Sequence, residues 1–139
     1  MHEIEKHVVV DKLMCEVWQN YVVILSELGG VKMPEFPAFE TSSEGTGTAG
    51  RFFPSTKTVW INLAYYHGGD TKQLRETIAH ELAHHICHHL YPDCKQWHGP
   101  EFRWVMMQIG YDGNTYHAMS RAMAVREARK AKDMLFNLD

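Results

Sequence analysis

The chain has 139 residues, which is enough for one domain built around one hydrophobic core. Hydrophobic residues make up 45% of the sequence, and the longest apolar run, residues 21–25, is far too short to span a membrane. Nucleic-acid-binding domains are typically strongly basic, whereas this chain has a net charge of −3. The overall charge therefore argues against nucleic-acid binding.

The N-terminal part of the chain predicts a helix over residues 11–28. Leucine, valine and tyrosine side chains recur on one face of this segment, as in a helix that packs on a core. Asp11 is the expected N-cap, and Gly29-Gly30 is the expected stop.

The middle of the chain predicts a small sheet. Short β-like runs are separated by turns that contain glycine or proline, and these runs span residues 36–41, 46–53 and 57–63. We expect an antiparallel three-stranded sheet packed on a helical core. This gives an α+β fold in a single domain, residues 1–139.

The segment 70–90 predicts an amphipathic helix, with Asp70 as its N-cap and aliphatic side chains recurring every four residues. Its other face carries His80 and His84, which are four residues apart and therefore lie one above the other. Two imidazoles at this spacing can bind one tetrahedral zinc ion, and the adjacent Glu81 can reach a water on that ion. The pattern predicts a zinc-dependent peptidase.

The third protein ligand must come from another segment. His98 precedes Gly99-Pro100, and proline favours the first turn of a helix, here expected over residues 99–110 and folding back across the first. We therefore favour His98 as the third ligand. Glu101, one turn further on, is the alternative, as in zincins that use a carboxylate.

Five further histidines lack the spacing of metal ligands. The helical rise places His88 about 12 Å along the axis from His80, so one ion cannot reach both of these rings and His84 between them. We expect packing, capping or surface roles for all five: His67, His85, His88, His89 and His117.

The run from Leu74 to Gly110 resembles the core of the SprT-like metallopeptidases, which include the Spartan DNA–protein crosslink proteases. That family carries HExxH on one helix and HGxxF at the start of the next. Both motifs occur here, in His80, Glu81, His84, His98, Gly99 and Phe102. The resemblance covers about residues 11–120 and is specific at the paired motifs.

This resemblance implies a zincin-like SprT-type domain that hydrolyses protein or peptide substrates. It implies one zinc ion per chain, held by His80, His84 and His98, with Glu81 as the general base. The sequence departs from the longer members because its three cysteines, Cys15, Cys87 and Cys94, form no CxxC pair, so a second structural zinc site of that type is excluded. Unpaired cysteines and a charged N-terminus predict a cytoplasmic location. We also expect a monomer.

The resemblance also implies a link to DNA. A last helix is expected over residues 115–136, where basic side chains outnumber acidic ones. Arg126, Arg129 and Lys130 are the candidate phosphate contacts, although a solvated helix face explains the same run.

The substrate side of the site is predicted less sharply. In zincins an extended substrate often pairs with an edge strand beside the metal, and the run 57–63 is the expected strand. Candidate oxyanion donors, each also explained by a structural role, are Arg51, Tyr111, Tyr116 and His117.

Other classes of function stay open alongside the peptidase. One is a zinc-stabilised binding module without catalysis, and another is an ImmA/IrrE-like regulatory peptidase with Glu101 as the third ligand. Glu81 favours an enzyme, because a purely structural metal site has no use for a carboxylate beside its first ligand.

Overall fold

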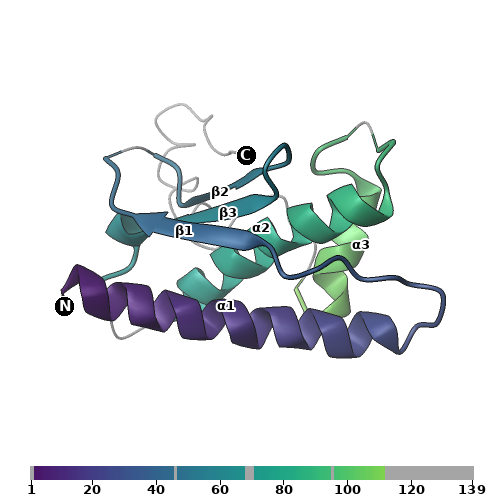
Figure 1. The fold of residues 1–139 in the computed structure, drawn as a ribbon, viewed down its shortest axis with the longest axis horizontal. Coiled ribbons are helices and arrows are strands. Elements are labelled where there is room, and N and C mark those ends of the chain that lie inside the picture. Colours follow the sequence, from purple (N-terminus) through teal and green to yellow (C-terminus); the bar gives the residue numbers. More distant parts are fainter. Residues whose placement is uncertain (1, 46, 68–70, 95, 112–139) are drawn as a thin grey trace, which may run out of the picture.

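The computed structural model describes residues 2–45, 47–67, 71–94 and 96–111. Three helices, one short 3₁₀ helix and a three-stranded sheet lie in these ranges: α1 (Glu3–Ser26), β1 (Ala38–Ser42), β2 (Gly50–Phe53), β3 (Thr58–Asn62), η1 (Leu63–Tyr65), α2 (Lys72–Leu90) and α3 (Pro100–Gln108). Figure 1 shows α1 along the lower side and the sheet above it, with α2 passing obliquely between them. The α+β class and the small sheet on a helical core are therefore confirmed.

The first helix begins eight residues earlier than Asp11, the predicted N-cap. Its first turn is held by a hydrogen bond of 2.8 Å from the backbone N–H of His2 to the Glu5 carboxylate. Acidic side chains in the first turn also stabilise the helix by interacting with the positive end of its dipole. The predicted stop is confirmed, because Gly29 and Gly30 follow the helix with φ of 64° and 76°, a left-handed conformation that glycine adopts without strain.

The sheet is mixed, with strand order β1-β3-β2. β2 pairs antiparallel with β3, as predicted, but β1 pairs parallel with β3, so the prediction of a wholly antiparallel sheet is wrong for this pair. The prediction that residues 57–63 form an edge strand is also wrong, because β3 is the central strand.

Asn62 gives the physical reason for this strand order. Its side-chain amide donates to the backbone carbonyls of Glu44 and Thr48, at 3.0 and 2.9 Å, and its Oδ1 accepts from the backbone N–H of Glu44 at 3.0 Å. These bonds hold the connection from β1 to β2 across the end of β3. The chain can therefore pass over β3 and place β2 on its far side.

α2 is the central element of the fold, since it contacts α1, α3, β2 and β3. All of its residues from Thr77 to Cys87 are buried. The polar side chains opposite the aliphatic stripe therefore face other parts of the protein and not solvent. The helix begins at Lys72 with Thr71 as its N-cap, so the prediction of Asp70 as the N-cap is wrong.

α3 begins at Pro100, as the Gly99-Pro100 pair predicts, and buries Phe102, Val105 and Met106 against the rest of the core. The helix expected over residues 115–136 lies outside the described residues, and the extent of the single domain stays a prediction. In the part of the chain that is described, no helix is long and apolar enough to cross a membrane.

Candidate metal centre

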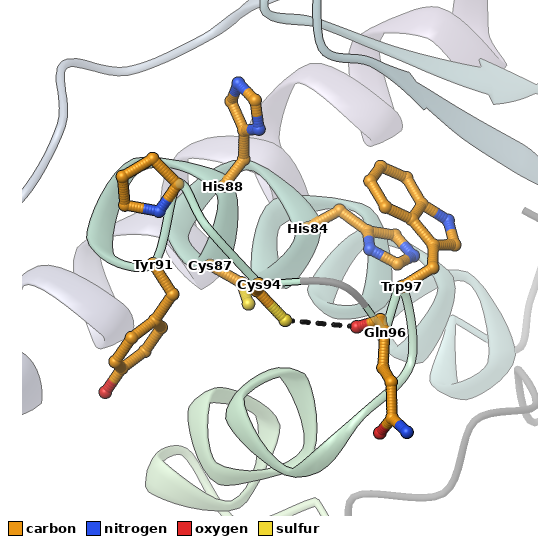
Figure 2. A pocket seen from close by; sticks show the side chains of 8 residues that line it. His84, Cys87, His88, Tyr91, Cys94, Gln96 and Trp97 are labelled. Carbon is orange, nitrogen blue, oxygen red and sulfur yellow. Dashed lines mark hydrogen bonds between the residues drawn. The ribbon is translucent and has the colours of Figure 1, made fainter.

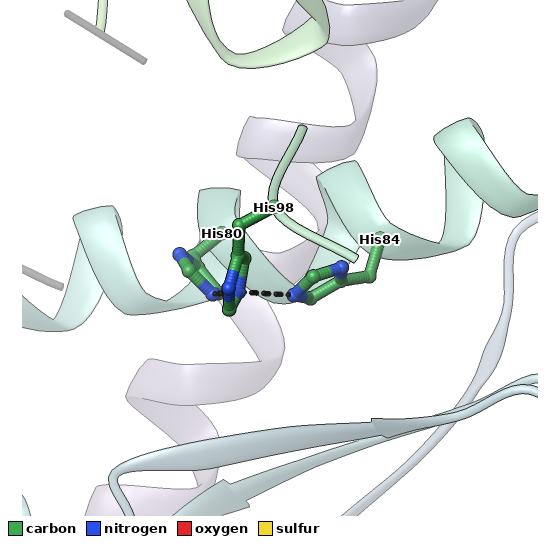
Figure 3. Close-up of side chains that lie close together, drawn as sticks. All are labelled: His80, His84 and His98. Atoms are coloured by element: carbon green, nitrogen blue, oxygen red, sulfur yellow. Dashed lines mark hydrogen bonds between the residues drawn. The ribbon is translucent and has the colours of Figure 1, made fainter. Parts of the chain in front are cut away.

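Three imidazoles meet where α2 faces the turn before α3. Nε2 of His98 lies 3.1 Å from Nε2 of His84 and 3.2 Å from Nε2 of His80. Figure 3 shows the rings of His80 and His84 projecting from α2 toward His98, so that the three nitrogens converge on one point. His80 and His84 are buried and His98 is half-buried.

This arrangement could hold a metal ion. A neutral imidazole Nε2 is either a donor or an acceptor, so one nitrogen cannot satisfy two neighbouring nitrogens equally well. A cation between the rings accepts a lone pair from all three. The ligand atoms lie within 4.8 Å of one another, and no fourth His, Cys, Asp or Glu joins the group among the residues that the structure describes.

Aromatic rings fix the plane of His84. Trp97 stacks on one face of its imidazole, with ring centroids 4.2 Å apart and planes 15° apart. Phe102 stacks at 4.4 Å and 30°, and it also meets the edges of His80 and His98. Trp97 stacks in turn on Phe52 of β2, at 6.4 Å. The aromatic contacts thus connect β2, the turn before α3 and α3 itself to one ring of the cluster.

Glu81 follows His80 on α2 and is fully buried. A Cβ atom placed on Gly50 of β2 would lie 3.1 Å from Cγ of Glu81, so the strand backbone runs directly against this side chain. The same Cβ would lie 3.1 Å from Cγ2 of Thr77, one helical turn before Glu81. The missing side chain of Gly50 therefore makes the room that the Glu81 carboxylate arm occupies.

β2 presents one edge beside this cluster. The backbone N–H of Asn62 donates to the carbonyl of Ala49 at 2.9 Å, and hydrogen-bonded pairs alternate from there along the antiparallel register. Gly50 and Phe52 therefore occupy the non-hydrogen-bonded positions, and their N–H and C=O groups point away from β3. In the described ranges, no strand pairs with this edge.

A comparison with protein-family models matches residues 29–122, more than half of the chain, to the SprT-like family. The chain belongs to the SprT-like family. Searches of curated proteins and of solved structures found no match. Together with the histidine cluster, membership of this family indicates a metalloprotease-type function.

The other histidines of this SprT-like chain lie apart from the cluster. Nε2 of His85 lies 2.8 Å from the backbone carbonyl of Glu35, and its ring packs between Trp18 and Phe52. Burial lowers the pKa of His85, and the nearby charges of His89, Lys57 and His88 lower it further, whereas the hydrogen bond to Glu35 raises it. The neutral ring is therefore favoured. His67, His88 and His89 are exposed, and His117 lies outside the described residues.

The other candidates from the sequence are the alternative ligand Glu101 and three possible oxyanion donors. Oε1 of Glu101 lies 3.5 Å from Sγ of Cys94, and Glu101 is not part of the group that could hold a metal ion. Arg51 is exposed on β2, on the face opposite to Gly50 and Phe52. Tyr111 is half-buried, and burial together with Glu76 raises its pKa. Tyr116 lies outside the described residues.

A small pocket of about 40 Å³, open to solvent, lies beside His84 at the end of α2. Figure 2 shows the thiols of Cys87 and Cys94 at this pocket, with Trp97 beside His84. Burial raises the pKa of Cys87 to about 12, with further contributions from Cys94 and Glu101. Neither the thiol pair nor the stacking of Trp97 is visible in the sequence, because both depend on how the turn before α3 folds back.

Proposed function

We propose that this chain is a zinc-dependent endopeptidase in which His80, His84 and His98 hold one zinc ion and Glu81 is the general base. The observation that carries this proposal is the convergence of the three Nε2 atoms at 3.1 and 3.2 Å. Nitrogen ligands about 2.0–2.1 Å from a tetrahedral zinc ion lie about 3.3–3.4 Å apart, which fits these separations closely.

The donor set favours a catalytic site over a structural one. Three neutral imidazoles leave a tetrahedral ion with one open position, whereas structural zinc sites are closed by a fourth protein ligand. In the described part of the chain, only three side chains form the group. A zinc ion held there would polarise a substrate carbonyl and lower the pKa of a water molecule to about 7.

Glu81 has the position that proton transfer requires. It is the residue after His80 on a rigid, buried helix, and the backbone of Gly50 confines its side chain from the strand side. We infer that its carboxylate takes the proton of the attacking water and delivers it to the leaving amine. General acid–base catalysis of this kind contributes about 10²–10⁴-fold to the rate.

We infer that substrate binds as an extended segment along the edge of β2. The outward N–H and C=O groups of Gly50 and Phe52 offer a main-chain hydrogen-bonding template. Recognition through the main chain tolerates many side chains, which suits an enzyme that cuts proteins rather than one defined peptide. The edge lies beside Glu81, so a bound strand brings its peptide bonds to the base.

Binding to DNA through Arg126, Arg129 and Lys130 stays a prediction, because these residues lie outside the described part of the chain. The regulatory peptidase with Glu101 as a ligand has less support, since this carboxylate contacts Cys94 instead.

The test is a proteolysis assay of the zinc-loaded protein and its Glu81→Gln variant, using unfolded casein as substrate with and without single-stranded DNA. We expect Glu81→Gln to keep about one zinc per chain and to lose at least about 10²-fold in peptide-bond cleavage. Glu101→Gln is the matched carboxylate control and retains activity. Equal cleavage by wild type and Glu81→Gln contradicts the mechanism, and zinc binding without cleavage by either protein favours the binding module.

A further inference from the structure

Two thiols lie together at the end of the site helix, outside the proposed catalytic machinery. Cys87 is buried near the end of α2, and Cys94 is half-buried in the segment that follows. Both line the pocket beside His84, and the nearness of Cys94 contributes to the raised pKa of Cys87. Figure 2 shows both sulfur atoms at this pocket, with that of Cys94 directed at the carbonyl of Gln96.

The backbone explains why these residues meet. The N–H of Tyr91 donates to the carbonyl of Cys87 at 2.8 Å, and the N–H of Cys94 donates to the carbonyl of Tyr91 at 2.9 Å. Two successive turns therefore bring the chain back over the end of the helix. The contact is built into the local path of the chain and does not depend on a distant element.

Cys94 also connects to the segment that carries His98. Its thiol donates to the backbone carbonyl of Gln96 at 3.2 Å, and this same carbonyl accepts the N–H of Gly99 at 3.2 Å. The turn from Gln96 to Gly99 holds His98 in place. The thiol of Cys94 is thus one of two donors to the carbonyl of Gln96 within this turn.

We propose that Cys87 and Cys94 form a reversible dithiol–disulfide pair that is oxidised by small disulfides of the glutathione type, and that oxidation loosens the turn carrying His98. The second part rests on the proposed metal site, whereas the first does not. Cys94 is the more exposed thiol and attacks first.

The chemistry balances in two exchange steps. Cys94 attacks one sulfur of the small disulfide, which gives a mixed disulfide on Cys94 and releases one small thiol that carries away the proton of Cys94. Cys87 then attacks the sulfur of Cys94, which closes the Cys87–Cys94 bond and releases the second small thiol with the proton of Cys87. Two protein thiols are oxidised and one disulfide is reduced to two thiols.

The order of attack agrees with the state of Cys87. Its raised pKa keeps it a buried thiol at neutral pH, so it is a poor first nucleophile and serves as the resolving group. Closure removes the S–H donor of Cys94 from the carbonyl of Gln96 and draws this sulfur to about 2.05 Å from that of Cys87. The carbonyl of Gln96 then keeps only the Gly99 donor.

The experiment uses the full-length, zinc-loaded protein equilibrated in glutathione buffers of graded redox potential, quenched, alkylated under denaturing conditions and analysed by peptide mass spectrometry. We expect a peptide linkage between Cys87 and Cys94 that dithiothreitol reverses. The exposed Cys15 of α1 provides the matched control: Cys15→Ser behaves as the wild type, whereas Cys94→Ser leaves Cys87 fully alkylated.

Accumulation of glutathione on Cys94 while Cys87 remains a free thiol would overturn the pairing. So would two unmodified thiols at a potential that already modifies Cys15. Because thiol counting needs no catalysis, the Glu81→Gln variant gives the same result, and failure of the proposed function is distinguishable from failure of the pair.

The effect on the turn is measured as the rate of zinc transfer to a chromogenic chelator. We expect the oxidised protein to release zinc about three- to tenfold faster than the reduced protein, the effect of one lost hydrogen bond. Cys94→Ala lacks the same donor and cannot form the disulfide, so it should release zinc at this faster rate under both redox conditions. Equal release by oxidised and reduced wild type would refute the coupling to His98.

Discussion

The hydroxyl of Tyr21 donates a hydrogen bond of 3.0 Å to the backbone carbonyl of Ala79, the residue immediately before His80. Tyr21 is fully buried on α1, and Ala79 lies where the ligand-bearing face of α2 begins. Burial raises the pKa of Tyr21 well above 10, and Tyr111 adds to this effect, so the hydroxyl remains a donor at neutral pH. The contact fixes the register of the site helix against α1.

Removing this hydroxyl is expected to destabilise the fold without dismantling the site. Tyr21→Phe keeps the packed ring and loses one buried hydrogen bond, so the free energy of unfolding should fall by about 0.5–1.5 kcal/mol. Urea denaturation followed by tryptophan fluorescence measures this change. Zinc content should be unaltered, and an unchanged unfolding midpoint would show that the bond contributes nothing.

The same tyrosine predicts a pH dependence. The folded-state pKa of Tyr21 lies above the unfolded value of about 10, so its contribution is fully present below pH 10 and is lost progressively as pH rises above it. The wild-type free energy of unfolding should therefore decrease more steeply than that of Tyr21→Phe above about pH 10. Parallel curves for the two proteins would contradict the assignment.

The choice between His98 and Glu101 as the third ligand is open to a direct test. His98→Ala removes one of three converging nitrogens and should lose most of the zinc, measured by metal analysis after dialysis against a weak chelator. Glu101→Ala should retain about one ion per chain. The reverse pattern would assign the site to the class that uses a carboxylate.

Gly50 is expected to be sensitive to a single methyl group. Gly50→Ala places a Cβ 3.1 Å from side-chain atoms of Glu81 and Thr77 and from the carbonyl of Trp60, so either the strand or the carboxylate arm must shift. We expect peptide cleavage to fall by about tenfold or more, because small misplacements of catalytic groups are costly, while zinc content stays near one.

The matched control for this prediction is Gly45→Ala. A Cβ at that position meets no atom within 4 Å, and it lies in the connection before β2. Its activity should equal that of the wild type. If Gly50→Ala is as active as Gly45→Ala, then close packing of the strand against Glu81 has no role in catalysis.

Trp97 is expected to hold His84 in its binding orientation. Trp97→Ala removes the stacked ring at 4.2 Å and should weaken zinc binding by about two- to tenfold, the usual range for an aromatic pair. Trp97→Phe keeps a stacking face and should recover most of this loss. Competition with a chelator of known affinity measures both variants, and equal affinities for all three proteins would remove Trp97 from the account of the site.

The features that the sequence predicts well are local ones. His80 and His84 meet because helical periodicity alone brings residues four apart together, and the Gly99-Pro100 pair marks where α3 begins. The sequence predicts the start of α1 too late in the chain, because His2 is not among the usual N-cap residues. The contact of His2 with Glu5 that begins the helix therefore has no recognisable N-cap signature in the sequence.

The remaining features depend on contacts between distant segments. Alternating side chains indicate a strand but not its neighbours, and the parallel pairing of β1 with β3 follows from the bonds that Asn62 makes far along the chain. The closeness of Gly50 to Glu81 likewise arises only when β2 packs on α2. Tertiary contacts of this kind leave no periodic signal.

The burial of α2 from Thr77 to Cys87 bears on the route by which a metal ion would reach the histidine cluster. Backbone amides in such a stretch exchange their hydrogens only when a large part of the molecule opens, so two of the three ligands belong to its slowest-exchanging region. His98 is half-buried and follows a segment with exposed residues, including Trp97. Opening at that side requires less of the fold to come apart, so we expect a metal ion to enter and leave past His98 while the helix beneath it stays closed.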